Sequence, residues 1–374
     1  MRAADPNAMK RRLRIFALGG NEVSPTGRFD PETGQHLMPD LSEQWRRTAD
    51  TCRHLTEIIK QAPDDLYILT HGNGPQVGNV LLRSEFSTPI LYPLPLDVCG
   101  ADTQGAMGYM LAQLSNTLRV AGLERIVAET VTQVVVDADD PSFANPSKFI
   151  GPAYSKDKAL RYREEGLAVS FYKRDEQGRE IWRRVVPSPV PLDILELDII
   201  EAVLANGHIP IAVGGGGIPV VRVPPRLEGQ EEVYEGKFGI SYRRPHRSGQ
   251  PPLAIHAGVE AVIDKDLASS LLGTMLLKRA WKRGEQLEAE LIILTNVDGV
   301  KLNFQEPDQQ DLRQLDLRQA EELDEQNTFP AGSMGPKIRA AISFLQGGGD
   351  RVYIGQVDKF RETVAGTAGT TIVS

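Results

Sequence analysis

The chain alternates short apolar runs with longer segments in which apolar residues recur every three or four positions. The first run, at residues 14–18, leads into glycines, which is typical of a buried strand that ends in a tight turn. Residues 41–59 follow with helical spacing, and Asp40 with Glu43 has the arrangement of a capping box. Strand and helix in regular succession predict an α/β protein with a mostly parallel sheet covered by helices on both faces.

This alternation continues almost to the end of the chain. A length of 374 residues, of which 41% are hydrophobic, is sufficient for a substantial core. We therefore expect one large domain over residues 14–374, after a disordered leader at 1–13. The pattern further predicts strands at residues 66–70, 126–136, 208–213, 259–263 and 291–295, and helices at 97–118, 194–204, 267–281 and 337–345.

Two segments depart from the alternation. Residues 137–186 are punctuated by prolines and then carry two short apolar runs around a turn at 175–178, which predicts a protruding, hairpin-bearing subdomain. This subdomain is suited to act as a lid. Residues 222–257 are polar, rich in proline and arginine and weakly periodic, so we expect a surface insertion there.

Charge and cysteine content narrow the classes of function. A formal net charge of −8 lacks the basic footprint of a general nucleic-acid binder, so we expect no nucleic-acid partner. The two cysteines, Cys52 and Cys99, form no CxxC motif and indicate neither a disulfide framework nor a cysteine zinc site. No run approaches the roughly 18 apolar residues of a membrane helix. We expect a cytoplasmic protein with no membrane partner.

Four glycine-rich loops follow the predicted apolar segments. Glycine lets backbone N–H groups approach a phosphate, and ligands of open parallel sheets bind beyond the carboxyl ends of the strands. The P-loop and GxGxxG patterns do not occur, which removes support for a P-loop kinase or a Rossmann dehydrogenase. The four loops are Gly19-Gly20-Asn21, Gly72-Asn73-Gly74, Gly214 to Gly217, and Gly332-Ser333-Met334-Gly335.

Three lysines are candidates for charge stabilisation in phosphoryl transfer. Fixed cations and Mg²⁺ compensate the negative charge of the transferred group without covalent chemistry from the protein. Lys265 lies between two aspartates after a predicted strand, so we expect it to point into the sheet's crevice. Lys148 and Lys337 are the other two candidates, and Lys148 is equally compatible with a solvated loop lysine.

Two further polar residues have alternative interpretations. Asp266 either orients the lysines or helps to hold Mg²⁺, and it is also suited to cap a helix that begins at Leu267. His71 precedes a glycine loop and is either a general base or a neutral histidine that supports the loop. No hydrolytic Ser/His/Asp pattern is present.

The motifs resemble the carbamate kinase family in content and in order. The similarity extends from about Arg14 to Val373 and weakens in the insertion at 222–257. It is carried by Ala17 to Asn21, His71 to Gly78, Asp97 to Ala101, Val185 to Pro189, Gly214 to Pro219, Gly258 to Ala268, Leu294 to Gly299 and Ala331 to Lys337.

The resemblance implies a three-layer α/β/α sandwich of the amino acid kinase fold, a homodimer, and reversible phosphoryl transfer between carbamoyl phosphate and ADP. It implies a carbamoyl phosphate and carbamate lobe at 14–220, a nucleotide lobe at 221–374, and Mg²⁺ that enters with ADP or ATP. The ion would be held by the nucleotide phosphates, alone or with Asp266.

The resemblance also assigns the site residues. Gly19, Gly20, Asn21, Gly72 and Asn73 would cradle the phosphoryl group and carbamate, with Gly214 and Gly215 nearby. Thr295, Asn296, Val297, Asp298, Met334 and Pro336 would form the adenine and ribose side, while Lys265 and Lys337 contact the nucleotide phosphates. Lys148 would reach in from the protruding subdomain.

Two departures from the family pattern and two alternative functions remain open. Glu22 replaces a small apolar residue, which raises a question about substrate fit, and the insertion is longer than the usual hairpin.

A kinase of the same fold that acts on N-acetylglutamate or glutamate is one alternative, but its first loop would carry a lysine beside the glycines. A catalytically silent regulatory protein is the other, and the three lysines argue against it.

Overall fold

An eight-stranded sheet forms the centre of the computed structural model, which describes residues 11–23, 28–29, 36–37, 40–175, 177–330 and 334–374. Neighbouring strands are parallel except for β21 and β22, which are antiparallel. The order is β20 (Gln314–Asp316), β22 (Thr370–Val373), β21 (Arg351–Gly355), β17 (Leu287–Leu294), β1 (Arg11–Leu18), β4 (Leu66–His71), β11 (Ile209–Ile211) and β5 (Val127–Glu129).

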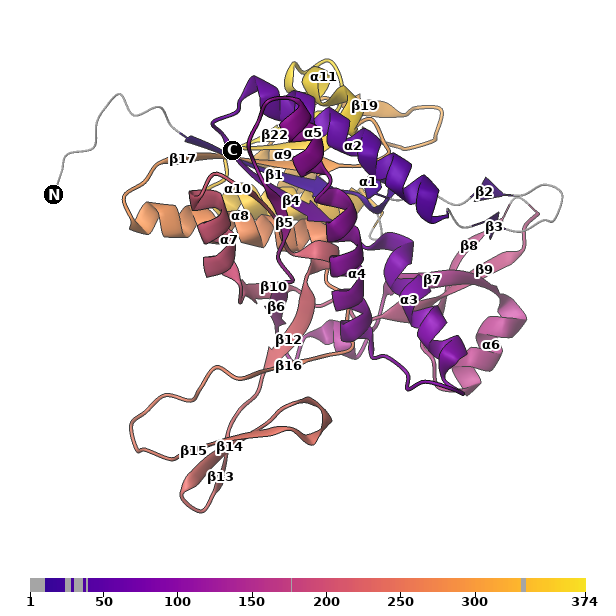
Figure 1. Cartoon of the computed structure of the whole chain (residues 1–374). Helices are drawn as coiled ribbons and strands as arrows, with labels where there is room; N and C mark the ends of the chain where they lie inside the picture. Colours follow the sequence, from indigo (N-terminus) through magenta and orange to yellow (C-terminus); the bar gives the residue numbers. More distant parts are fainter. Residues whose placement is uncertain (1–10, 24–27, 30–35, 38–39, 176, 331–333) are drawn as a thin grey trace.

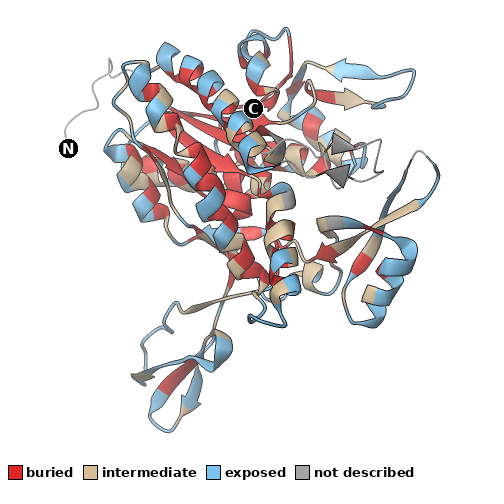
Figure 2. Ribbon diagram, turned by 45° about the vertical axis from the view of Figure 1, so that its right-hand side comes forward, coloured by how far each residue is buried: buried red, intermediate tan, exposed pale blue. Residues whose placement is uncertain are grey.

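Helices cover both faces of this sheet, as the sequence predicts (Figure 1). Side chains of β1 alternate between two cores: Leu13 and Ile15 belong to one, Phe16 and Leu18 to the other. Figure 2 shows the buried residues concentrated between these layers. The first core is covered by α7 (Leu197–Ala205), α8 (Lys265–Lys282), α9 (Leu317–Glu325) and α10 (Met334–Gln346), and the second by α2 (Leu41–Gln61), α4 (Leu96–Leu111), α5 (Leu114–Val120) and α11 (Phe360–Val364).

A second, smaller sheet corrects two predicted strands. It has the order β10 (Pro191–Ile194), β6 (Gln133–Val136), β12 (Ile218–Arg222) and β16 (His256–Gly258). The strand expected at 126–136 is divided between the two sheets, as β5 and β6. The strand expected at 259–263 is wrong: this segment is irregular, although Ala261, Val262 and Ile263 are buried. Its backbone is held by a hydrogen bond of 3.0 Å from Val262 N to Pro187 O.

The segment at 137–186 forms a separate projection beside α3 (Gly74–Ser87) (Figure 1). It consists of β7 (Lys148–Ser155), α6 (Lys156–Glu164), β8 (Val169–Arg174) and β9 (Glu180–Val186), in the sheet order β7-β9-β8. The antiparallel pair β8 and β9 confirms the predicted hairpin.

The insertion at 222–257 projects beyond the ends of β12 and β16, away from the central sheet, and is more ordered than its sequence indicates (Figure 1). It forms an antiparallel sheet of β13 (Arg226–Glu228), β14 (Glu231–Glu235) and β15 (Ser241–Pro245). Its turn η3 (Lys237–Gly239) returns to the body, where Lys237 Nζ lies 2.5 Å from Asp97 Oδ1.

The structure corrects two more boundaries. Strand β1 begins at Arg11, so residues 11–13 lie in the central sheet and not in a leader, while residues 1–10 lie outside the described chain. The fourth glycine loop does not follow a strand, because it connects α9 to α10. Gly332 and Ser333 lie outside the described residues, and Met334 and Gly335 begin α10.

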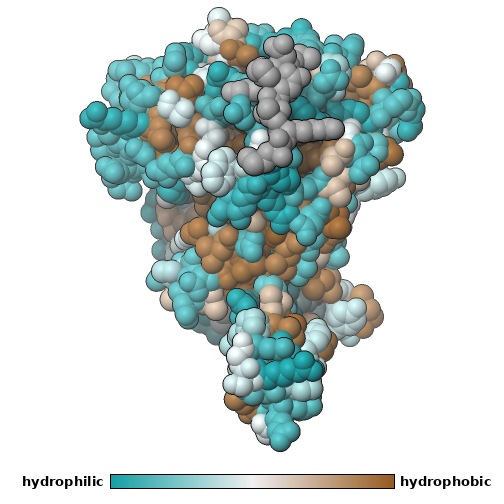
Figure 3. All heavy atoms as spheres, turned by 90° about the vertical axis from the view of Figure 1, so that its left-hand side faces the viewer, coloured by the Kyte–Doolittle hydropathy of each residue, from teal (hydrophilic) through white to brown (hydrophobic). Residues whose placement is uncertain are grey.

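None of the helices in the described chain is long and apolar enough to cross a membrane. A hydrophobic band crosses the face in Figure 3, on the side that carries α7 and β10 in Figure 1, and Leu192 and Ile199 of these elements are exposed. The short elements are α1 (Gly20–Val23), β2 (Arg28–Phe29), β3 (His36–Leu37), η1 (Pro141–Phe143), η2 (Gly214–Gly216), β18 (Val300–Leu302), β19 (Gln310–Leu312) and η4 (Val357–Lys359).

Candidate active site

A cleft of about 340 Å³ opens beyond the carboxyl ends of the central strands. The ends of β1, β4 and β17 meet there because these strands are parallel neighbours. The lining brings together twelve of the residues singled out in the sequence: Gly19, Gly20, Gly72, Asn73, Lys148, Gly215, Lys265, Asp266, Thr295, Asn296, Pro336 and Lys337.

At two glycines of this cleft, the backbone lies so close to a neighbouring side chain that there is little room for a Cβ atom. A Cβ atom at Gly72 would lie 3.1 Å from Cδ of Lys265, so a side chain there would press on the lysine stem. Gly215 has φ +64°, and a Cβ atom would lie 2.4 Å from Nδ2 of Asn73. The Asn73 amide in turn lies 3.3 Å from Thr103 Oγ1 of α4, which holds it from behind.

Asp266 is the centre of a buried charge cluster. Its Oδ1 pairs with Lys265 Nζ, and its Oδ2 lies 2.8 Å from Lys337 Nζ. Burial disfavours the charged carboxylate, but the two ammonium groups outweigh this effect and hold the pKa of Asp266 well below its ordinary value. Asp266 contacts both lysines, and its role in orienting them stays a prediction. Its predicted alternative role as a helix cap is wrong, because Asp264 caps α8.

The two lysines of this cluster respond differently to burial. Desolvation lowers the pKa of Lys265, and the attraction of Asp266 only partly opposes that shift. Burial also acts to lower the pKa of Lys337, but Asp266 outweighs it and the pKa is raised. Lys265 also lies 3.3 Å from the carbonyl oxygen of Ala17 at the end of β1. The carboxylate therefore keeps two cations together at the floor of the cleft.

Lys148 reaches the same region from the protruding subdomain. Its Nζ lies 2.7 Å from Asp264 Oδ2, and its side chain remains 35% exposed. Asp264 Oδ1 accepts the backbone N–H of Asp266 at 2.9 Å as the cap of α8. Sequence reasoning noted Asp264 only as a neighbour of Lys265, and its partner lies 116 residues away.

His71 supports the glycine loops from within the protein. Its side chain is fully buried, and burial lowers its pKa to about 4, so the ring is neutral near pH 7. A Cβ atom at Gly214 would lie 2.5 Å from His71 Nε2, and Gln104 Nε2 donates to the Gly214 carbonyl at 3.1 Å. This environment favours the neutral, supporting histidine over the general base.

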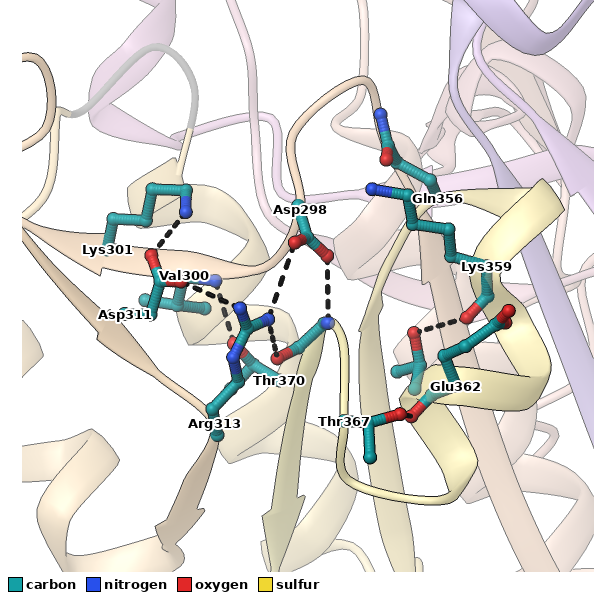
Figure 4. A network of polar contacts seen from close by, with 12 residues as sticks. Asp298, Val300, Lys301, Asp311, Arg313, Gln356, Lys359, Glu362, Thr367 and Thr370 are labelled. Atoms are coloured by element: carbon teal, nitrogen blue, oxygen red, sulfur yellow. Dashed lines mark hydrogen bonds and ion pairs between the residues drawn. The ribbon is translucent and has the colours of Figure 1, made fainter.

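The loop after β17 carries several of the predicted nucleotide residues. Thr295 and Asn296 line the cleft, whereas Asp298 belongs to a polar network. Asp298 Oδ1 accepts the Gly369 N–H at 2.9 Å, and Oδ2 lies 3.5 Å from Arg313 Nη1 (Figure 4). The backbone hydrogen bond from Gly369 is the main reason that the pKa of Asp298 is lowered. Val297, Asp298 and Met334 are not part of the cleft lining, and their nucleotide role stays a prediction.

Three other sequence candidates lie beside the lining or outside the description. Glu22 is 2% exposed, its Oε2 lies 2.9 Å from Arg47 Nη2 of α2, and it is not among the residues that line the cleft. Burial raises the pKa of Glu22, and Arg47 opposes this shift. The side chain of Asn21 is not among those the structure describes. Gly214 lies behind the lining, against His71.

The cleft also contains apolar side chains that sequence reasoning missed. Val77, Phe149, Ile150, Val262 and Leu294 line it. Their only sequence signal was proximity to the glycine motifs and to Lys148. Across the described residues, no group of three or more His, Cys, Asp or Glu side chains is placed to hold a metal ion.

Comparison with known proteins agrees with this geometry. The model of the amino acid kinase family matches residues 280–356. The chain is 37% identical over 364 residues to a carbamate kinase of Thermococcus kodakarensis, covering 96% of this chain and 98% of the relative. A carbamate kinase of Oenococcus oeni is 35% identical over 369 residues, covering 97% and 99%. The structure of carbamate kinase from Giardia lamblia bound to AMP-PNP aligns with a TM-score of 0.72 at 31% identity, covering 97% of this chain and 98% of that one.

Proposed function

The chain belongs to the carbamate kinase family, and from this membership we propose that its cleft transfers a phosphoryl group reversibly between carbamoyl phosphate and ADP. In the forward direction a β-phosphate oxygen of ADP attacks the phosphorus of carbamoyl phosphate. The bond between phosphorus and the carbamoyl oxygen breaks, and ATP and carbamate are formed.

One observation carries this proposal. Lys148, Lys265 and Lys337 come from three separate segments and meet Asp264 and Asp266 in one glycine-lined cleft. Phosphoryl transfer brings two anionic substrates together, and fixed cations stabilise the charge that spreads over the transferred group. The aspartates keep these cations oriented before the phosphates arrive.

We assign the two sides of the cleft by the family resemblance. The phosphoryl and carbamate side would be formed by the first two glycine loops, where Lys148 can reach the transferred group. The nucleotide side would be formed by the loop after β17 and the start of α10, with Lys265 and Lys337 on the phosphates. The proposed phosphoryl side is Gly19, Gly20, Asn21, Gly72 and Asn73 with Gly214 and Gly215, and the proposed nucleotide side is Thr295, Asn296, Val297, Asp298, Met334 and Pro336.

The carboxylates fit magnesium that arrives with the nucleotide better than a resident ion. Asp264 and Asp266 already accept ammonium groups from the lysines. Mg²⁺ prefers oxygen ligands and commonly binds through substrate phosphates with one or two carboxylates. We propose that Asp266, after its lysines turn to the phosphates, is the carboxylate available to such an ion, which would neutralise phosphate charge.

A coupled assay tests the proposed reaction. Purified protein is supplied with carbamoyl phosphate, ADP and Mg²⁺, and ATP is read through hexokinase. We expect ATP formation that depends on all three components and stops with excess EDTA. N-acetylglutamate with ATP is the control for the alternative kinase. Turnover of that substrate alone, or a folded protein without turnover of either, would contradict the proposal.

We also propose that the protein acts as a cytoplasmic homodimer, as its family resemblance implies. The exposed apolar side chains of β10 and α7 supply surface that a second copy could cover. Light scattering after size exclusion tests the assembly, and a mass near the 41.1 kDa of a single chain would contradict it.

A further inference from the structure

The strand that carries Lys148 is interrupted three residues later by a bulge. In the antiparallel pairing of β7 with β9, Lys148 faces Val186 and Ile150 faces Arg184, but the next pair is Ala153 with Arg183. The two residues between Ile150 and Ala153 therefore have no partner in the register. A bulge of this kind bends a strand and changes the direction of the side chains that flank it.

Arg183 holds this bulge from the neighbouring strand. Its Nη2 and Nε both donate to the carbonyl oxygen of Gly151, at 2.7 and 3.2 Å. Gly151 has φ +66°, a conformation that glycine adopts without strain. The guanidinium also lies over the ring of Tyr172, 5.2 Å from its centroid, so its plane is fixed by β8 as well.

The opposite side of the bulge is pressed against α3. A Cβ atom at Gly78 would lie only 2.3 Å from Cα of Gly151, so the two backbones touch where both residues lack a side chain. Helix α3 begins at Gly74, which lines the cleft. The bulge is thus fixed between the helix that leaves the cleft and the arginine of β9, and its position sets where β7 starts.

We propose that Arg183 is a positioning residue for phosphoryl transfer, which holds the Gly151 bulge so that Lys148 stands over the cleft. This inference rests on the function proposed above, because it acts through Lys148. Arg183 itself is not among the residues that line the cleft. The single carbonyl that it binds lies three residues from the lysine, within the same strand.

Substitution at Arg183 tests this role. We expect Arg183→Ala to lower kcat with carbamoyl phosphate by about tenfold, while the Kd of ADP measured by calorimetry changes by less than about twofold. Arg183→Lys keeps the charge but cannot donate two hydrogen bonds from one planar group. Its kcat should therefore lie between that of the unaltered protein and that of Arg183→Ala. Arg179→Ala is the matched control, because Arg179 pairs with Asp175 in the turn of the same hairpin.

A double-mutant cycle separates positioning from general support of the subdomain. In the Lys148→Met background, Arg183→Ala should change kcat by less than about twofold, because the lysine through which it acts is gone. An equal tenfold loss in both backgrounds, or a normal kcat for a folded Arg183→Ala protein beside a slow Lys148→Met, would overturn this inference alone. A normal kcat for Lys148→Met would contradict the proposed role of the lysine and remove the inference with it.

Discussion

Two small antiparallel sheets project from the body, one in the protruding subdomain and one in the insertion. Each of these two segments carries a lysine that pairs with an aspartate at the start of a helix in the body. In the protruding subdomain, Lys148 Nζ lies 2.7 Å from Asp264 Oδ2. In the insertion, Lys237 Nζ lies 2.5 Å from Asp97 Oδ1. The two ion pairs are alike in geometry, but Asp264 lines the cleft and Asp97 does not.

The attachment of each sheet explains why we expect only the protruding subdomain to contribute to the proposed reaction. Ile150 and Val186 of the subdomain share a core with Val77 of α3, a residue that lines the cleft. In the insertion, Tyr234 is buried and donates to Glu232 of the same strand at 2.7 Å. A lysine and an aspartate in contact are therefore weak evidence of function until the surroundings of the pair are known.

The largest predicted effect is the loss of the subdomain lysine. Lys148→Met should lower kcat by at least about 100-fold, because a cation that stabilises the transferred group mainly in the transition state is removed. The Kd of ADP should stay within about threefold. Steady-state rates and calorimetry measure the two quantities.

The matched control for this variant comes from the insertion. Lys237→Met removes the same chemical group from an equivalent contact, and we expect kcat to stay within about twofold of the original value. Equal losses of kcat in the two variants would mean that the cleft lining does not distinguish the two lysines.

Removal of the insertion should have a smaller effect, on stability and not on chemistry. Replacing residues 225–248 by a short glycine linker leaves every cleft-lining residue in place, so kcat should stay within about threefold. Asp97, whose side chain is 7% exposed, loses its cation. A buried carboxylate without its partner costs on the order of 1–3 kcal/mol, and Tm should fall by a few degrees.

Asp97→Asn in the deleted protein is the control for this explanation. It removes the unpaired charge, so Tm should recover part of the loss in a thermal scan. A folded deletion protein that forms no ATP would show instead that the insertion takes part in catalysis.

The smallest effect concerns acid sensitivity of the insertion. Hydrogen bonds from Arg244, Tyr234 and His246 lower the pKa of Glu232 to about 2. Because this pKa lies below the ordinary value of 4.5, the stabilisation is complete above pH 4.5 and is lost as the pH falls toward 2.

Glu232→Gln should imitate the acid form at neutral pH. We expect faster hydrogen exchange in β13 to β15 and an unchanged kcat, while Glu228→Gln, which alters a more exposed carboxylate, should leave exchange nearly as it was. Faster exchange in the subdomain as well would contradict the independence of the two sheets.

Local signals in the sequence were sufficient for the main elements of the fold. Asp40 and Glu43 form the predicted capping box of α2, and the apolar run at 14–18 lies within β1. The run at 259–263 misled because burial alone produced its apolar character, and a short apolar run does not distinguish a strand from a buried irregular segment. Strand β14 was not predicted, because one of its buried positions is occupied by the charged Glu232 and not by an apolar residue.

The candidate site shows a similar division. Lys265 was expected in the crevice because it lies between two aspartates after a predicted strand, and it does line the cleft, although the segment before it is irregular and not a strand. The contact of Lys148 with Asp264 depends on how β7 is bent and on where α3 lies. Such contacts between distant segments are set by tertiary packing, and no local pattern encodes them.

The central place of β1 has a consequence for the growing chain. This strand has β4 on one side and β17 on the other, so its second neighbour ends at Leu294. At a synthesis rate of about 5–20 residues per second, β17 emerges from the ribosome on the order of tens of seconds after β1. During that interval β1 has an open edge with free backbone donors and acceptors, which is a surface on which other strands can add. The nascent chain therefore has an edge open to mispairing at a strand that lies inside the finished sheet.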